Sequence, residues 1–362
     1  MTTVTGYIVP VEEFRDFVVR CSKSVGIAED HADSLAEMVV SADYRGHYSH
    51  GLKNLERYLI CVRKGIISRS GKPEVVKQTA ATALVDGHKL LGPVVGNFCM
   101  DLAMEKAKAA GVGIVSVRGS NHYGMAALYG LRALKHGMIG IALTNTSPGM
   151  APTRGKENVL GTNPICVAAP GTDGDSFLLD MATSAVAYGK AINAKRIGVT
   201  IPEGWAVDKD GQNITDPNFV YGMLPLGGVE STSGYKGYGL AMMVEIFCGI
   251  LSGSNYGHHI ISVSDQINKE ANLGQCFIAI NPDAFEDGFS ERMSELLNYC
   301  RALEPVEGEN EVLVAGDPER KHMEKCEKQG GILYHPEQMK QANSIAASCN
   351  VEPMKVLKTL MK

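Results

Sequence analysis

Short apolar runs of strand length alternate with segments of helical spacing through the middle of this chain, and this alternation constrains the fold more than any other feature. Apolar runs bounded by Gly, Pro or polar residues are typical of buried strands. The sequence predicts strands over Ala83–Asp86, Val112–Val117, Met138–Asn145, Ile165–Ala169, Phe177–Asp180 and Cys276–Ile280. Because helical segments separate these strands, we expect an α/β protein of mixed α+β type.

Both ends of the chain are predicted to be helical. Apolar residues recur every three or four positions over Val11–Cys21 and Ala28–Ala42, with breaks at Gly26 and near Arg45-Gly46. Further helices are predicted over Pro93–Ala109, His122–His136, Ser184–Asn193, Leu240–Leu251, Ala284–Leu303, Pro318–Lys328 and Pro336–Cys349. The Leu240–Leu251 helix is so apolar that we expect it to be buried. A turn-rich hairpin is expected over Gly204–Asp216.

The composition excludes several classes of protein. The chain has 362 residues, which predicts about two domains at roughly 100–200 residues each. Its formal charge of −5, without a run of Lys or Arg, argues against a nucleic-acid partner. No window reaches the roughly 18 consecutive apolar residues of a membrane helix, and Met1–Val11 lacks the layout of a signal peptide. We therefore expect a cytoplasmic protein that does not bind membranes.

The 9 cysteines are scattered along the chain without a CxxC pair. In a long chain of this type, such a set indicates free thiols and neither disulfides nor a zinc ribbon.

The densest cluster of chemically active side chains lies over residues 43–51, with Arg45, His47, Ser49 and His50 close together. An imidazole with a pKa near ~6.5 can act as an acid or a base while an arginine holds an anion. A capped, solvated loop explains the same residues. A metal site using His47 and His50, three positions apart, lacks a third ligand nearby.

A second cluster, Gly119 to Gly124, follows a predicted strand and opens a predicted helix. Phosphates and cofactors often bind there, because the first backbone N–H groups of a helix are unpaired. The alternative is an ordinary helix cap in which His122 has no chemical role.

Three weaker clusters follow along the chain. Gly161 to Pro164 is a loop that can fix backbone polar groups near a ligand or simply connect two elements. Asp180 at a strand end can orient a histidine or cap the next helix. Gly227, Gly228 and Lys236, ahead of an apolar helix, can bind phosphate. No G-x-G-x-x-G follows a strand, so a nicotinamide cofactor would not sit on an ordinary Rossmann unit.

Together, these clusters resemble the type 2 malate/L-lactate dehydrogenase family, which differs from the Rossmann-type enzymes of similar name. The resemblance spans about Val11 to Ala347. It is carried by Arg45-Gly46-His47, Ser49-His50-Gly51, Ser120-Asn121-His122-Tyr123-Gly124, Leu160-Gly161-Thr162-Asn163-Pro164, Asp180-Met181-Ala182-Thr183-Ser184 and Gly234-Tyr235-Lys236-Gly237-Tyr238-Gly239-Leu240.

The resemblance implies a non-Rossmann dinucleotide-binding fold with helical N- and C-terminal segments, a homodimer, and NAD or NADP as cofactor. Residues 73–299 are then the NAD(P)-binding domain, and residues 1–72, with the catalytic loop, pack with the helices of residues 300–362. The implied reaction interconverts a 2-hydroxy acid and its 2-oxo acid, with L-malate and oxaloacetate expected first. Lactate, sulfolactate, ureidoglycolate and diketogulonate types are alternatives, as is a catalytically silent dinucleotide-binding protein.

The resemblance also assigns roles by position. The implied catalytic residues are His50, His122, Ser49 and Asp180; the implied substrate contacts are Arg45, Thr162 and Lys53; the implied cofactor contacts are His122, Tyr123, Gly124, Met181, Ala182, Gly227, Gly228, Lys236 and Arg320. No metal is implied.

This chain departs from the family pattern at two positions. Asn54 stands where many members have an arginine that is a candidate for binding the substrate carboxylate, so Lys53 or Arg45 is expected to replace it. Tyr188 likewise stands where many members have an arginine.

Overall fold

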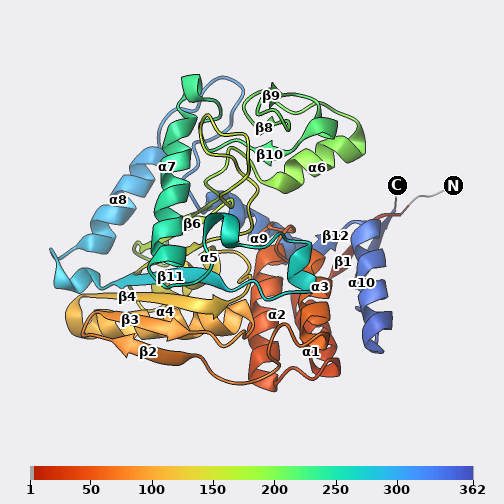
Figure 1. The fold of residues 1–362 in the computed structure, drawn as a ribbon, viewed down its shortest axis with the longest axis horizontal. Helices are drawn as coiled ribbons and strands as arrows, with labels where there is room; N and C mark the ends of the chain where they lie inside the picture. The colour runs from red at the N-terminus through yellow and green to blue at the C-terminus, as the bar shows by residue number, and fades with distance from the viewer. Residues whose placement is uncertain (1–3, 362) are drawn as a thin grey trace.

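The computed structural model describes residues 4–361 and is built around a mixed sheet of seven strands (Figure 1). The strand order across the sheet is β2-β3-β4-β11-β5-β6-β7. The strands are β2 (Glu74–Gln78), β3 (Thr82–Asp86), β4 (Val112–Ser120), β5 (Ile139–Thr144), β6 (Ile165–Pro170), β7 (Ser176–Met181) and β11 (Leu273–Ile280). Only β3 and β4 pair in parallel, so the sheet is not of the Rossmann type.

Helices cover both faces of this sheet. On one face, α4 (Gly92–Ala110) and α5 (Ala127–Leu134) pack against β4, β11, β5 and β6, where Phe277 joins the largest hydrophobic core. The neighbouring Cys276 points to the other face and packs with α7 (Gly234–Glu245) and the π-helical turn Ile246–Ile250. Successive residues of one strand thus serve two cores, as the alternation of strand side chains requires.

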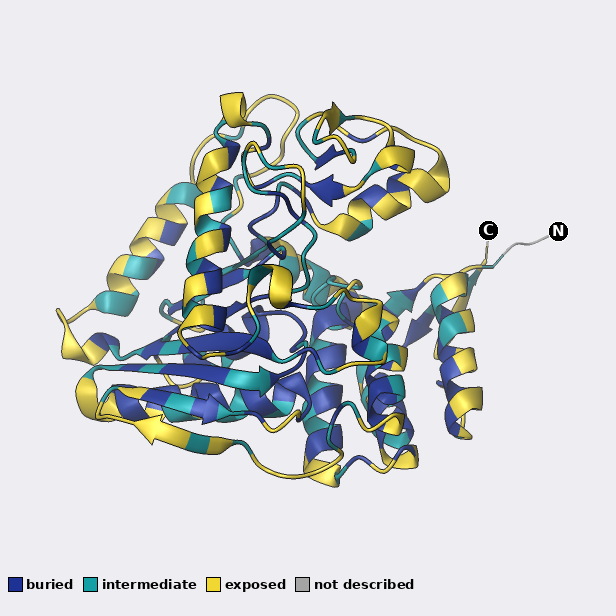
Figure 2. Cartoon of the chain, viewed as in Figure 1, coloured by how far each residue is buried: buried dark blue, intermediate teal, exposed yellow. Residues whose placement is uncertain are grey.

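The two chain ends meet in a small second sheet of order β12-β1-β13. Its strands are β1 (Val4–Val9), β12 (Ile332–Tyr334) and β13 (Lys358–Met361). Around it lie α1 (Val11–Ser24), α2 (Glu29–Tyr44), α3 (Leu52–Arg63), α9 (Asp317–Gln329) and α10 (Pro336–Cys349). Figure 2 shows the inner faces of these helices buried and the outer face of α10 exposed. The predicted domain boundaries at residues 72 and 300 stay a prediction.

The remaining elements lie at the rim. Strands β8 (Ala206–Val207), β9 (Asn213–Ile214) and β10 (Gly222–Met223) form a small sheet beside α6 (Tyr188–Ile197). Helix α8 (Phe289–Arg301) packs on β6 and β7. At the two edges of the large sheet, β2 carries a register irregularity between Val75 and Lys77, and Leu178 of β7 donates its N–H to the carbonyl of Ala315.

Most predicted elements are confirmed, and the mixed α/β class is correct. The Pro336–Cys349 helix and the hairpin of β8 and β9 lie where they were expected. Gly111 ends α4 in the left-handed conformation, with φ +79°, which suits glycine. All 9 cysteines are free thiols. Among the described residues, no helix is long and apolar enough to cross a membrane.

Several helix predictions are wrong in extent or burial, among them the helix expected from Ala284, which begins at Phe289. The helix expected from His122 begins at Ala127, because residues 121–126 are irregular and Gly124 adopts φ +81°. The helix expected from Ser184 begins at Tyr188. The apolar Leu240–Leu251 segment is not wholly buried, since Ile246 is 50% exposed. Helix α3 and the small terminal sheet were not predicted.

Gly92, the first residue of α4, supports the backbone next to a predicted site residue. A Cβ at this position would lie 2.3 Å from the carbonyl oxygen of His122, a distance that real contacts do not show. We expect Gly92→Ala to lower the free energy of unfolding by about 1–3 kcal/mol through overpacking. Thermal unfolding of Gly189→Ala is the control, because nothing lies within 4 Å of a Cβ there. Equal melting temperatures for the two variants would contradict this account.

Candidate active site

Five strands of the large sheet have an end on the same side of the sheet, because of their order and direction. Strands β4, β5 and β7 finish on this side, whereas their antiparallel neighbours β11 and β6 start there. The residues at or just beyond these ends are His122, Thr144, Asp180, Leu273 and Pro164, and all of them line one cavity of about 550 Å³. The topology therefore gathers distant segments into a single site.

The loop between α2 and α3 forms another part of the cavity wall and carries His47, Ser49 and His50. Asp43, at the end of α2, is buried beneath this loop and accepts hydrogen bonds from the N–H of Leu52 at 3.1 Å and the hydroxyl of Tyr334 at 2.8 Å. Burial raises the pKa of Asp43 to about 7, against the lowering effect of these two bonds. Gly51 makes the close approach possible, since a Cβ there would collide with the Asp43 carboxyl.

His50 and His122 are stacked neighbours in the wall of the cavity. Their rings are nearly parallel, with centroids 5.8 Å apart and an interplanar angle of 14°. The Ser49 hydroxyl lies 2.9 Å from Nδ1 of His50, and the Tyr58 hydroxyl lies 2.6 Å from Nδ1 of His122. Each imidazole thus has a hydroxyl partner on one nitrogen.

Burial keeps both imidazoles neutral at pH 7. It is the largest cause that lowers the pKa of His50 to about 4, with smaller contributions from the positive charges of His47, Arg57 and Lys53. Burial also lowers the pKa of His122 well below its usual value, helped by Arg57 and His50. These shifts follow from the loss of hydration of a charged ring.

Several predicted residues lie together on the cavity wall. They are Ser49, His50, His122, Tyr123, Gly124, Thr162, Asp180 and Ala182. Asp180 accepts a hydrogen bond from the N–H of Ala127 at 2.7 Å, so its carboxylate caps α5. Its charge also favours the protonated form of His47, whose pKa is raised mainly by a bond to Glu319.

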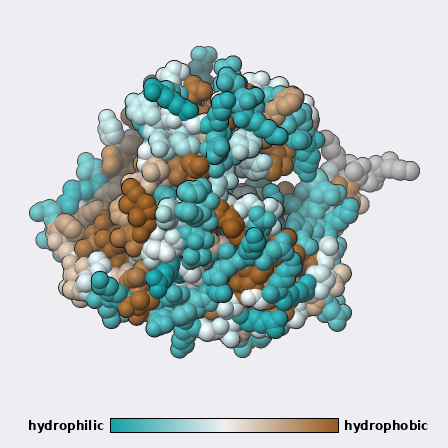
Figure 3. Space-filling view, in the orientation of Figure 1, coloured by the Kyte–Doolittle hydropathy of each residue, from teal (hydrophilic) through white to brown (hydrophobic). Residues whose placement is uncertain are grey.

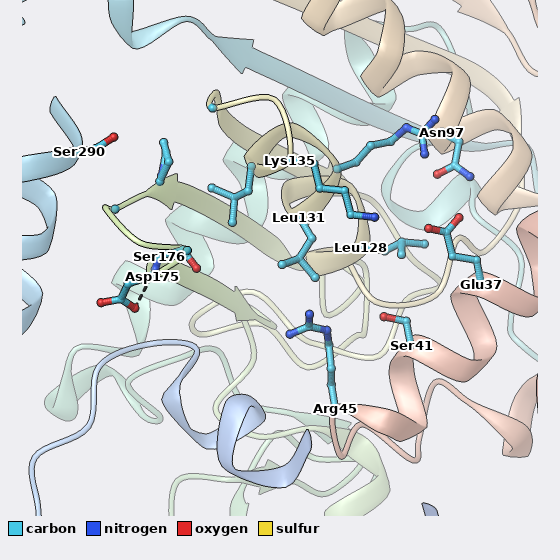
Figure 4. A pocket seen from close by; sticks show the side chains of 16 residues that line it. Glu37, Ser41, Arg45, Asn97, Leu128, Leu131, Lys135, Asp175, Ser176 and Ser290 are labelled. Carbon is cyan, nitrogen blue, oxygen red and sulfur yellow. Dashed lines mark hydrogen bonds between the residues drawn. The ribbon is translucent and has the colours of Figure 1, made fainter. Parts of the chain in front are cut away.

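Other predicted residues lie elsewhere. Arg45 lines a different cavity, where its side chain points toward Leu131 of α5 (Figure 4). Lys53 is exposed. Arg320 is bound to Asp317 at 2.6 Å, and Lys236 lies over the ring of Tyr235. The other predicted contacts outside the wall are Met181, Gly227 and Gly228.

Arg57 is a charged cavity residue that was not predicted from the sequence. It lies on α3 and lines the cavity together with both histidines. Its position is three residues after Asn54, whose side-chain amide donates to the carbonyl of Ser49 at 2.8 Å. Residues three apart share one face of a helix, and this spacing was the signal that could have found it. His47, Asn158 and Tyr188 also line the wall.

Among residues 4–361, no group of three or more His, Cys, Asp or Glu side chains is arranged to hold a metal ion. Nε2 of His47 lies 3.4 Å from the Glu319 carboxylate, and His50 has the Ser49 hydroxyl as its neighbour.

Comparison with known proteins agrees with this architecture. Residues 9–342 match the family model described as malate/L-lactate dehydrogenase. A malate dehydrogenase of Pyrococcus abyssi is 44% identical over 299 residues, covering 81% of this chain and 82% of the relative. A malate/(S)-sulfolactate dehydrogenase of Methanothermus fervidus is 38% identical and covers 95% of this chain and 99% of the relative.

The structure of malate dehydrogenase from Pyrococcus horikoshii OT3 superposes with a TM-score of 0.88 and 36% identity, covering 98% of each chain. The names of some other relatives specify NAD(+), and the name of another specifies NADP(+). With the match spanning nearly the whole length, this chain belongs to the malate/L-lactate dehydrogenase family of nicotinamide-dependent enzymes.

Proposed function

We propose that the protein interconverts L-malate and oxaloacetate with a nicotinamide dinucleotide as cofactor. The observation that carries this proposal is the stacked pair of His50 and His122, whose lowered pKa values keep both imidazoles neutral, in one cavity with the guanidinium of Arg57. A 2-hydroxy acid needs these groups: a base for its hydroxyl proton, a donor for its oxygen and a cation for its carboxylate. Malate comes first because relatives that cover most of the chain carry that name.

The residues present fit the nicotinamide end of the cofactor. Hydroxyl-bearing Thr144, Thr146 and Thr162 line the cavity beside apolar Ala182 and Leu273. The backbone of Gly189 is open, because nothing lies within 4 Å of the place where a Cβ would stand. When bound, the cofactor accepts or supplies hydride at its nicotinamide ring, and the protein orients the substrate.

The hydrogen bonds distinguish the two histidines. Nδ1 of His122 accepts from the N–H of Gly124 at 3.3 Å, and a backbone N–H can only donate. Neutral His122 therefore carries its proton on Nε2 and is suited to donate a hydrogen bond to the substrate oxygen. The Ser49 hydroxyl can donate to or accept from Nδ1 of His50, so Nε2 of His50 can present either a lone pair or a proton. His50 is the acid and base in this proposal.

Arg57 takes the role of carboxylate partner that the resemblance gave to Arg45 or Lys53. A planar guanidinium binds a carboxylate through two parallel hydrogen bonds. A carboxylate bound beside His50 also favours the imidazolium form, so substrate binding raises the low pKa of His50 toward the value that proton transfer requires.

The test of function is loss of nicotinamide absorbance with NADH and then NADPH, using oxaloacetate, pyruvate and a panel of bulkier 2-oxo acids. Rapid oxidation with oxaloacetate supports malate and selects the cofactor. Activity only with a lactate, sulfolactate, ureidoglycolate or diketogulonate type of substrate would replace malate within the same reaction class. Cofactor binding without turnover of any panel member would favour a silent dinucleotide-binding protein.

Replacing the acid and base should slow turnover with little effect on folding. We expect His50→Asn to lower kcat by about 10²–10⁴. His122→Asn should lower it by about 10²–10³, the loss typical of one hydrogen-bond donor to the reacting oxygen. His258→Asn is the control, because His258 is exposed and does not line the cavity. Steady-state rates that stay within tenfold for both cavity variants would contradict the assignment.

The pH dependence of malate oxidation should reflect the lowered pKa of His50. Malate oxidation needs neutral His50, and a lowered pKa means that the neutral form persists to lower pH. Since the pKa of His50 is about 4 in the free enzyme, kcat/KM for oxidation should be flat down to about pH 5 and fall as pH approaches 4. Initial rates after brief transfer to each pH, with circular dichroism to confirm folding, measure this. A break near ~6.5, the usual histidine value, would contradict it.

Removing the guanidinium should weaken substrate binding. We expect Arg57→Gln to raise KM for the 2-oxo acid by about 10–100-fold, the loss of one charged hydrogen-bonded contact, with Arg57→Lys intermediate. Lys53→Gln is the matched control, because it removes a nearby exposed charge outside the cavity. A larger effect of Lys53→Gln than of Arg57→Gln would return the role to Lys53.

We also propose a homodimer and a cytoplasmic location. Helix α7 and the π-helical turn expose an apolar stripe of Tyr235, Met242, Ile246 and Ile250. Figure 3 shows hydrophobic side chains gathered in this region of the surface. Such a patch is typical of an interface between proteins. The nine free thiols suit a reducing compartment.

A charge in the stripe should separate the subunits. Light scattering after size exclusion should give twice the chain mass of 38.8 kDa for the wild type and a single chain mass for Ile246→Glu. Ile192→Glu, at an equally exposed isoleucine of α6, should stay dimeric. A monomeric wild type, or a dimeric Ile246→Glu, would show that this stripe is not the interface.

A further inference from the structure

Glu245 is a buried carboxylate outside the catalytic cluster. It is the last residue of α7, directly before the π-helical turn, and only 3% of it is exposed. Among the described residues, no Lys, Arg or His pairs with it, and its three partners are neutral N–H donors. A buried carboxyl group without a basic partner is unusual and needs hydrogen bonds to its oxygens to persist.

The three donors come from three different segments. Oε1 accepts from Nδ2 of Asn145 at 3.1 Å and from the N–H of Gly257 at 2.7 Å. Oε2 accepts from Nδ2 of Asn163 at 2.8 Å. The carboxylate therefore ties α7 to the end of β5, to the loop before β6 and to the segment near residue 257.

Both asparagines are fully used. Oδ1 of Asn145 accepts from the N–H of Gly274 at 3.0 Å, and its Nδ2 also donates to the carbonyl of Asn255 at 2.9 Å. Oδ1 of Asn163 accepts from the N–H of Thr146 at 3.1 Å, and its Nδ2 also donates to the carbonyl of Ala241. Because neither amide can turn over without losing bonds, each presents only its N–H groups to Glu245.

The segments held in this way form one wall of the cavity. Asn145 and Thr146 line it from the end of β5, and Thr162 and Pro164 line it from the loop before β6. Asn163, between the last two, adopts φ +30°, a left-handed conformation that side chains rarely take. Its bonds to Glu245 and Thr146 hold that conformation, so the position of the Thr162 side chain depends on the network.

We propose that Glu245 is a positioning residue that sets the geometry of the cofactor wall through Asn145 and Asn163. This inference rests on the proposed function, because the wall is where the nicotinamide is expected to bind. The carboxylate is suited to this role because it only accepts hydrogen bonds and can take one from each of several loops at once. A glutamine has the same shape but must direct its own NH₂ at one of the donors.

The variant Glu245→Gln tests this. If the introduced glutamine keeps its oxygen toward Asn145 and Gly257, its NH₂ faces the NH₂ of Asn163, and the loop of residues 161–164 is pushed away. Asn163→Asp in the same chain restores the pair with donor and acceptor exchanged and with the net charge unchanged. The introduced aspartate then accepts from the new glutamine and from the N–H of Thr146, but it loses the bond to Ala241 and places an oxygen near that carbonyl.

The measurement is the Kd of NADH and NADPH by nicotinamide fluorescence, with the melting temperature recorded for each protein. We expect Glu245→Gln to raise the Kd by about tenfold or more, the loss of one buried hydrogen bond to a charged group. Asn163→Asp alone should also bind weakly, since two carboxylates then face each other. The double variant should bind more tightly than either single variant, because the two changes compensate each other at the Glu245–Asn163 pair.

Val18→Ala is the control for stability alone, because Val18 is fully buried on α1 and does not line the cavity. If Glu245→Gln lowers the melting temperature as Val18→Ala does but leaves the Kd unchanged, Glu245 is merely structural and the inference is overturned. If Glu245→Gln does not fold, a folded double variant that binds more tightly than Asn163→Asp supports the inference, and one that binds as weakly as Asn163→Asp overturns it. A wild type that binds neither nucleotide would overturn the proposed function first.

Discussion

The insertion of β11 between β4 and β5 is the constraint on which the site depends. A strand from residues 273–280 separates two strands that are close in sequence, and it runs antiparallel to both. The C-terminal ends of β4 and β5 therefore lie on the same side of the sheet, and His122 and Thr144 at these ends line one cavity. If β4 and β5 paired directly as antiparallel neighbours, their C-terminal ends would lie on opposite sides of the sheet. A single long-range pairing thus decides whether a site exists.

Desolvation links this architecture to chemistry. The same packing that gathers the strand ends removes water from His50 and His122, and that loss lowers both pKa values. Arg57 adds to the effect, so a group suited to bind an anion also keeps the imidazoles uncharged until the anion arrives. Asp43 lies under the loop that carries His50 and joins the start of α3 to Tyr334 in the C-terminal part of the chain. Residues almost three hundred positions apart thereby fix one loop.

The sequence patterns predicted those features of the structure that depend on residues close together in the chain, such as helix ends and contacts between adjacent side chains. Ser49 and His50 stand in contact because they are adjacent, and α4 starts and ends near Pro93 and Gly111 because those residues favour helix ends. Nothing local could place β11, since its neighbours in the sheet lie more than a hundred positions away. Arg57 was missed because α3 was not predicted, and without a helix the three-residue spacing from Asn54 does not indicate a shared face. The exposed stripe of α7 was not predicted because the whole helix was expected to be buried. Its high apolar content does not indicate which side chains point to the core and which to the surface.

The edges of the large sheet have a consequence for how copies of the chain can meet. At one edge, β2 is short, carries Glu74 and Lys77, and is interrupted by an irregularity after Val75. At the other edge, the N–H of Leu178 is already bonded to Ala315. Charges and bulges discourage strand addition, and a covered edge offers no template. Continuous sheets across subunits, and the fibrous aggregates that grow from them, are thereby disfavoured, so association is left to helical surfaces.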